Sequence, residues 1–189
     1  MNVENRVVIV TGATGGLGRI ATKLFADQGT RLVLVGTHLE KLEHLIEELS
    51  LPRERILLHA ADLSRPEAAH TLAQETLERF GQIYILLHLV GGWSGGSPVT
   101  EVEDEQVESM LQQHLWTTYH LAQAIIPAMV ASRWGRILVI SSPIASHGDT
   151  LLNGQMDTSR LSRIILTALV PYLVSTVSSA SSILSMRKG

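Results

Sequence analysis

The stretch Thr11-Gly12-Ala13-Thr14-Gly15-Gly16-Leu17-Gly18 decides the fold of this chain. It follows an apolar, β-branched run at residues 6–10, which predicts a strand buried on both faces. It precedes residues 19–28, where apolar side chains keep helical spacing. The stretch is therefore predicted to be a tight turn from a strand into a helix. Backbone N–H groups at such a helix start, together with the helix dipole, favour a pyrophosphate, which a side chain on the turn would block.

Strand and helix patterns alternate along the rest of the chain. Apolar runs predict further strands at residues 32–35, 56–58, 83–90 and 136–140, with helices at 39–49, 64–80 and 104–129 between them. Ser64-Arg65-Pro66-Glu67 has the pattern of a capping box at the start of one of these helices. This order predicts an α/β fold, a doubly wound parallel sheet in a Rossmann-type, three-layer αβα arrangement.

In a doubly wound sheet the ligand belongs at the carboxyl ends of the strands. The predicted strands of this chain lead there into Gly12, Thr37, Asp62, Gly91 and Ser142. Five strand ends that converge on one edge support a binding site there better than any single motif does.

Composition limits the classes of protein to which this chain can belong. Its 189 residues fit a single domain over residues 1–189, and 45% hydrophobic with 17% charged residues is globular composition. A net charge of −3 without a basic cluster argues against nucleic acid as a partner. No cysteine is present, and His114 and His120, which are six residues apart, lack metal-ligand spacing, so no metal is expected. No apolar leader precedes the first strand, and we expect a cytoplasmic protein.

The glycine spacing Thr-Gly-x-x-x-Gly-x-Gly resembles that of the short-chain dehydrogenases/reductases. The resemblance continues through Asp62-Leu63, similar to the family's adenine-contacting Asp-Val, and through residues 135–142, so it covers residues 6 to about 146. It implies an oxidoreductase that transfers hydride between a nicotinamide dinucleotide and a carbonyl or alcohol of a small-molecule substrate. The cofactor-binding positions that it implies are Gly12, Thr14, Gly16, Leu17, Gly18, Thr37, Asp62, Leu63 and Gly91.

The end of the second predicted strand bears on which dinucleotide is bound. In NAD-binding folds an acidic residue at this position binds the ribose 2′-hydroxyl. Here the position is Gly36, followed by Thr37 and His38, and no carboxylate is available to repel a 2′-phosphate. The sequence therefore favours NADP(H) over NAD(H). The alternative role for Thr37 is to cap the helix that follows.

The catalytic positions match the family only in part. The family's relay resembles Asn-Ser-Tyr-Lys, in which the tyrosine is the acid/base. Ser142 stands at the serine position, where it could also be a strand-end cap, and His114 stands at the asparagine position, where it could also be an ordinary helix residue. Met156 and Arg160 fall at the Tyr-x-x-x-Lys pair; methionine cannot transfer a proton, whereas Arg160 could still contact a ribose. A dinucleotide-binding protein without turnover is therefore the alternative function.

The motif after the fourth predicted strand also departs from the family. The family's Asn-Asn-Ala-Gly reads His88-Leu89-Val90-Gly91 here. Gly91 keeps the close approach to the cofactor. The asparagines that brace the central strand are replaced, so we expect a weaker brace.

The segment 148–189 is atypical of the family, and we expect a fold shortened at its C-terminal side. Residues 164–185 carry no charge. The segment could be a degenerate end that packs on the sheet, or an out-of-frame or alternative terminus. A membrane anchor at residues 164–184 is a third interpretation, which Pro171 and the serines disfavour, so a membrane partner is not expected. Family members pair their long fourth helix across a dimer or tetramer interface, which implies a homo-oligomer.

Overall fold

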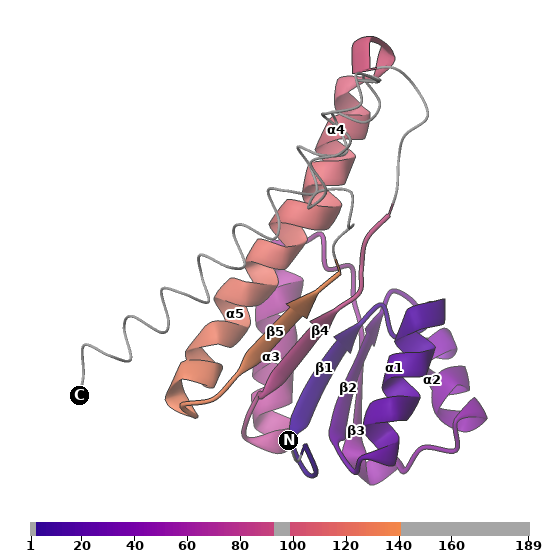
Figure 1. The fold of residues 1–189 in the computed structure, drawn as a ribbon, viewed down its shortest axis with the longest axis vertical. Coiled ribbons are helices and arrows are strands. Elements are labelled where there is room, and N and C mark those ends of the chain that lie inside the picture. The colour runs from indigo at the N-terminus through magenta and orange to yellow at the C-terminus, as the bar shows by residue number, and fades with distance from the viewer. Residues whose placement is uncertain (1–2, 93–98, 141–189) are drawn as a thin grey trace, which may run out of the picture. The chain divides into compact units, whose positions relative to one another are not determined.

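The computed structural model describes residues 3–92 and 99–140. A five-stranded sheet in the order β3-β2-β1-β4-β5 organises them, and every neighbouring pair of strands is parallel (Figure 1). The strands are β1 (Val7–Thr11), β2 (Arg31–Gly36), β3 (Ile56–Ala60), β4 (Ile85–His88) and β5 (Arg136–Val139). The predicted doubly wound, Rossmann-type α/β fold is confirmed.

Helices connect the strands. They are α1 (Gly16–Asp27), α2 (Leu39–Glu48), α3 (Pro66–Phe80), α4 (Asp104–Leu111) and α5 (Thr117–Ala131), with a π-helical turn at Gln112–Trp116 and 3₁₀ turns at Arg53–Arg55 and Val99–Glu101. A glycine with positive φ follows α1 (Gly29, +71°) and α3 (Gly81, +76°), where the chain turns through a conformation that glycine adopts without strain.

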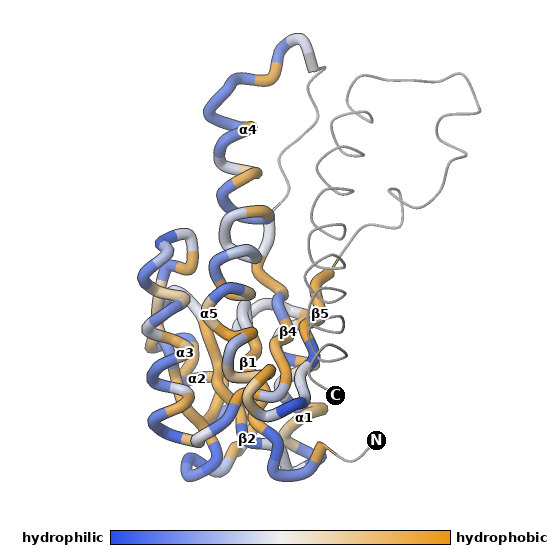
Figure 2. Tube along the Cα trace, turned by 90° about the vertical axis from the view of Figure 1, so that its left-hand side faces the viewer, coloured by the Kyte–Doolittle hydropathy of each residue, from blue (hydrophilic) through white to orange (hydrophobic). Residues whose placement is uncertain are grey.

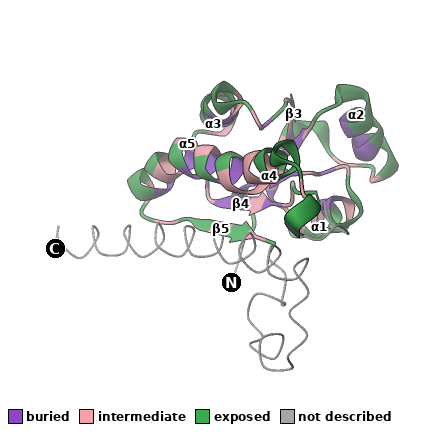
Figure 3. Ribbon diagram, turned by 90° about the horizontal axis from the view of Figure 1, so that it is seen from above, coloured by how far each residue is buried: buried purple, intermediate pink, exposed green. Residues whose placement is uncertain are grey.

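Each face of the sheet has its own hydrophobic core. On one face, Val7 and Ile9 of β1 pack with residues of α3 and α5; on the other, Val8 and Val10 pack with residues of α1 and α2. Figure 3 shows buried residues, in purple, in helices of both layers and in the strands, and Figure 2 shows the strands mainly in the orange of hydrophobic residues. Because both faces of β1 are covered, its first four residues are all apolar, and only Thr11 at its end is polar.

The chain divides into two compact units, which are described separately. Residues 1–90 with 119–139 form the first unit, which holds the sheet. The second unit comprises residues 91–118 with 140–189; its described helix α4 begins with two acidic residues, Asp104 and Glu105, and buries none of its side chains. Acidic residues in a first turn stabilise the positive end of the helix dipole.

Two expectations about helices need correction. The predicted capping box at Ser64 does not form, because the backbone N–H of Ser64 donates to Asp62 and the cap position of α3 is Arg65. The helix predicted over 104–129 is interrupted at Gln112–Trp116 by a π-helical turn.

No helix within residues 3–92 and 99–140 is long and apolar enough to cross a lipid bilayer. The candidate anchor at residues 164–184, like the whole atypical segment 148–189, lies outside the described residues.

Candidate functional site

Two glycines of the β1–α1 turn are required by the protein's own packing. Gly12 has a φ of +67°, and a Cβ built on it would lie 3.3 Å from the carbonyl carbon of Leu89. A Cβ on Gly18 would lie 2.1 Å from the carbonyl oxygen of Gly12, closer than any atom can approach. The turn therefore closes on itself and on the end of β4 only because these positions lack side chains.

Gly16 is different. A Cβ built on it meets no atom of residues 3–92 and 99–140 within 4 Å, and its φ is not in the left-handed region. Internal packing therefore does not explain a glycine at this position. The surface next to it is left open, with Gly15 and Leu17 exposed on either side.

The start of α1 suits an anion. Gly15 occupies the cap position, so no side chain caps the first N–H groups, and no acidic residue lies in the first turn. Uncapped N–H groups and the positive end of the dipole together form a site for a phosphate. Thr14, half-buried in the turn, and the exposed Leu17 lie at this helix start, which comes at Gly16 and so earlier than the predicted residue 19.

The turn is held to its neighbouring strands by hydrogen bonds. The Ala13 N–H donates to the Val35 carbonyl of β2 at 3.1 Å. The hydroxyl oxygen of Thr11 accepts the N–H of Leu89 at 3.1 Å and lies 2.8 Å from Nδ1 of His88. The His88 imidazole thus makes a link between β1 and β4 at the position of the expected brace, and the expectation that this brace is weaker stays a prediction.

The end of β2 carries Thr37 and His38, both exposed. The helix α2 takes His38 as its cap position, and no side chain makes a capping hydrogen bond there. The alternative in which Thr37 caps this helix is therefore wrong. The hydroxyl of Thr37 is not used for capping, and residues 36–38 bring no carboxylate to this strand end.

The end of β3 presents Asp62 beside Leu63. Leu63 is buried in the core beneath α3, whereas Asp62 is exposed. The Asp62 carboxylate accepts the Ser64 backbone N–H at 3.0 Å. Hydrogen bonds from the side chain and backbone of Ser64 hold the pKa of Asp62 below its usual range, so it is an acceptor at neutral pH.

Two predicted site residues of the second unit lie against each other. His114 Nε2 lies 2.8 Å from the carbonyl oxygen of Gly92, and a Cβ on Gly91 would lie 2.8 Å from His114 Cε1. A side chain at position 91 would therefore displace the His114 imidazole from the place it takes here. His114 lies in the π-helical turn, a distortion frequently found at functional sites, so it is not in a regular α-helix. Ser142 and Arg160 lie outside the described residues.

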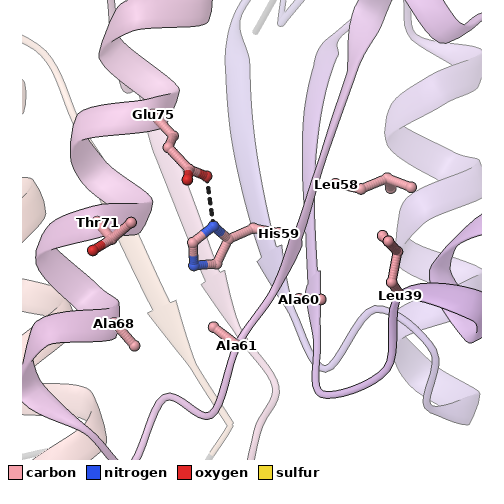
Figure 4. Close-up of a pocket in the computed structure, with 8 residues that line it drawn as sticks. All are labelled: Leu39, Leu58, His59, Ala60, Ala61, Ala68, Thr71 and Glu75. Atoms are coloured by element: carbon pink, nitrogen blue, oxygen red, sulfur yellow. Dashed lines mark hydrogen bonds and ion pairs between the residues drawn. The ribbon is translucent and has the colours of Figure 1, made fainter.

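A separate hollow of about 420 Å³ lies beside the edge strand β3 (Figure 4). His59 projects from β3 into it and is held by Glu75 of α3, whose carboxylate oxygen lies 2.7 Å from His59 Nδ1. The walls are otherwise small or apolar, including Ala60, Ala61 and Leu58. Among the described residues, none that is predicted to bind cofactor or to act in catalysis lines this hollow.

Sequence reasoning missed the pair Thr11 and His88. Both are buried, with 0% and 2% of their surface exposed. The available signal was a hydroxyl directly before the first turn glycine and a polar residue that ends an apolar strand. Their contact depends on the register, which pairs Thr11 with His88, and the sequence does not show this register.

Known proteins resemble this chain in sequence and in structure. A family model described as short chain dehydrogenase matches residues 6–153. Dehydrogenase/reductase SDR family member 7B of Xenopus tropicalis is 37% identical over 147 residues, which are 74% of this chain and 47% of that protein. An uncharacterized oxidoreductase of Listeria monocytogenes is 27% identical over 142 residues, 75% of this chain and 57% of that protein. The chain thus spans about half the length of these relatives.

Solved structures agree. A short-chain dehydrogenase/reductase of Brucella melitensis, described as glucose/ribitol dehydrogenase, superposes with a TM-score of 0.79 at 25% identity, over 95% of this chain and 68% of that one. A short chain dehydrogenase of Bacillus anthracis shares the fold, with a TM-score of 0.80 at 23% identity over 95% of this chain and 69% of that one. The glycine turn, the parallel sheet and these matches lead to one assignment. The chain belongs to the short chain dehydrogenase family.

Proposed function

We propose that this chain is an oxidoreductase that binds a nicotinamide dinucleotide on the β1–α1 turn and transfers hydride to or from a carbonyl or alcohol of a small molecule. The observation that supports this most strongly is the contrast among the turn glycines. Gly12 and Gly18 serve the packing of the turn, whereas Gly16 faces open space at an uncapped helix start. A pyrophosphate approaching these N–H groups explains why a side chain is absent at Gly16.

The remaining strand ends supply the other contacts in this proposal. Thr14, Leu17 and Gly18 complete the pyrophosphate turn, Asp62 and Leu63 hold the adenine, and Gly91 allows close approach. Thr37 faces the adenosine ribose. We favour NADP(H) over NAD(H), because the free hydroxyl of Thr37 can donate to a 2′-phosphate and no carboxylate at this strand end repels one.

When bound, the nicotinamide supplies or accepts the hydride. In the proposal, Ser142 polarises the substrate carbonyl, His114 holds a water or a proton near it, and Arg160 contacts the nicotinamide ribose. His114 is restrained for such a role, because the Gly92 carbonyl holds one ring nitrogen. We further propose a cytoplasmic homo-oligomer, a dimer or tetramer, acting on a small molecule rather than on a nucleic acid or a membrane.

A dinucleotide-binding protein without turnover is the second candidate. It is favoured by a specific observation, since no tyrosine of this chain is followed four residues later by a lysine. Without that pair the usual acid/base is missing, while the turn that holds the cofactor is complete.

Titration with NADPH and NADH, followed by nucleotide fluorescence, tests binding in the full chain. We expect saturable binding that Gly16→Asp abolishes without loss of the fold, because a carboxylate would occupy the pyrophosphate position. Thr37→Asp should weaken NADPH more than NADH, since the new carboxylate repels a 2′-phosphate. Equal effects on both nucleotides would contradict the NADP(H) preference, and absence of binding to either would contradict the proposal.

Turnover is tested separately with aldehydes, ketones and quinones, by loss of NADPH absorbance. Substrate-dependent oxidation supports the oxidoreductase. Binding of NADPH with no oxidation across these classes supports the protein without turnover.

A further inference from the structure

The carboxyl end of β4 lies beside that of β1 at the centre of the sheet (Figure 1). There Thr11 and His88 are directly paired in the register of the two strands. Thr11 Oγ1 lies 2.8 Å from His88 Nδ1, and both residues are buried. Because water does not reach these buried groups, breaking their hydrogen bond would leave both without a solvent partner. The bond therefore restrains the two strand ends strongly.

The Thr11 hydroxyl serves two partners. It accepts the N–H of Leu89 at 3.1 Å on one lone pair. A hydroxyl has one proton and two lone pairs, so it can also donate to a neutral imidazole at Nδ1. One atom of β1, the Thr11 hydroxyl oxygen, is thus hydrogen-bonded both to the side chain of His88, the last residue of β4, and to the backbone N–H of Leu89.

This atom directly precedes the glycine turn. Gly12 follows Thr11 and lies close to the Leu89 peptide, since a Cβ built on it would lie 3.3 Å from both the carbonyl carbon and the oxygen of Leu89. The Thr11 hydroxyl holds the N–H of Leu89 on the other side of the same junction. We therefore expect a shift of the Leu89 peptide relative to β1 to disturb the turn.

We propose that His88 is a positioning residue for dinucleotide binding, which acts through Thr11 to set the β1–α1 turn. An imidazole takes over a bracing role for which the family resemblance leads one to expect asparagine. His88 need not touch the cofactor in this proposal. The inference rests on the proposed function, because the turn it positions is the one proposed to hold the pyrophosphate.

The test is a double-mutant cycle in the full chain, with the dissociation constant for NADPH and the free energy of unfolding measured for each protein. The variants are His88→Leu, Thr11→Val and their combination. Loss of one buried hydrogen bond should weaken NADPH binding about 3- to 10-fold in each single variant. The dissociation constant of the double variant should lie within about 2-fold of that of the single variant that binds NADPH more weakly, because both changes remove the same hydrogen bond.

Conservative variants separate positioning from packing. His88→Asn and Thr11→Ser keep a hydrogen-bonding group at each position and should bind NADPH within about 2-fold of the natural chain. Leu86→Ala is the matched control, because Leu86 is a buried residue of the same strand that lies two residues before His88. It should lower the stability and leave the dissociation constant within about 2-fold, since it makes a cavity away from the turn.

The outcomes distinguish this inference from the proposed function. If His88→Leu binds NADPH as the natural chain does while losing stability as Leu86→Ala does, or if the two single effects on binding add, His88 is only a core residue. If the natural chain binds neither NADPH nor NADH, the proposed function fails. Amide exchange then decides the structural part: faster exchange at Ala13 in His88→Leu, and not in Leu86→Ala, shows that His88 sets the turn, and unchanged exchange overturns this too.

Discussion

Replacing Gly18 by alanine tests whether the turn is built as described. A Cβ at this position would lie 2.1 Å from the Gly12 carbonyl oxygen and 2.8 Å from the Ala13 carbonyl carbon. Both atoms belong to the backbone, so no side chain can rotate away. The turn must open by close to 1 Å before the contact reaches even the 3.0 Å that real Cβ atoms show. Overpacking of this kind costs about 1–3 kcal/mol.

Gly16→Ala is the matched control. Both glycines lie in the first turn of α1, so alanine brings each of them a similar gain in helix propensity, up to about 1 kcal/mol. The Gly16 variant has no clash to offset that gain, because its Cβ meets nothing within 4 Å. The difference between the two variants therefore isolates the clash. For a chain of this length, about 1–3 kcal/mol corresponds to about 2–12 °C in melting temperature.

Urea denaturation and thermal melting of both variants, in the absence of nucleotide, measure this difference. We expect Gly18→Ala to be less stable than Gly16→Ala by the amount above, and Gly16→Ala to match or exceed the natural chain. Equal stability of the two variants would refute the reasoning about Gly18. With NADPH added, Gly16→Ala should bind more weakly despite its intact fold, because its methyl group points into the proposed cofactor space.

Two further predictions concern groups away from the turn. Arg6 stacks on Trp134, with its guanidinium carbon 4.0 Å from the ring centroid. Arg6→Ala should therefore lower the free energy of unfolding, measured by urea denaturation, by about 0.5–2 kcal/mol. Arg6→Lys should recover only part of this loss, and full recovery would show that the planar stacking is unimportant. The pKa of Asp62 is lowered by its hydrogen bonds from Ser64, so its contribution to stability is present above the ordinary aspartate pKa and lost as pH falls through the lowered value. The stability difference between the natural chain and Asp62→Asn should be constant near neutral pH and shrink in acid; a difference that grows in acid would contradict this.

Much of the fold could be predicted because its signals are local. The first four residues of β1 are all apolar and β-branched, since both faces of a central parallel strand are covered. The glycine turn was predicted for the same reason, because a strand that leads straight into a helix leaves a distinct pattern over a few residues.

Both errors about helices concern local hydrogen bonds that composition does not reveal. Ser64 is a residue type that often caps a helix, but its backbone N–H donates to the Asp62 carboxylate instead of taking part in a capping box. The sequence alone does not show which of these two local hydrogen bonds forms. The π-helical turn at Gln112–Trp116 lies within the residues that the sequence predicts as one continuous helix. The hydroxyl of Thr117 donates to the Gln112 carbonyl at 2.7 Å, a contact that becomes evident only in three dimensions.

The candidate site could likewise be predicted only where its signals are local in sequence. The sequence predicted that Gly12, Gly16 and Gly18 are all needed because a side chain would block the turn. Only the structure separates Gly12 and Gly18 from Gly16, because the distinction depends on what a Cβ would meet. The link between Thr11 and His88 depends on strand register, which brings together residues 77 positions apart. Contacts of this range leave no periodic trace in a single sequence.

That separation also affects the order of events during synthesis. Val7 of β1 pairs with Arg31 of β2, which is translated soon afterwards, but Thr11 waits for His88. At about 5–20 residues per second, the ribosome needs about 4–15 s to add those 77 residues. During this interval one edge of β1 has no strand to pair with, and the glycine turn lacks the backbone of Leu89 against which it packs. We therefore expect a nucleotide at the proposed turn site to assist the nascent chain only after β4 has emerged, and the interval before that is when we expect this domain to depend most on chaperones.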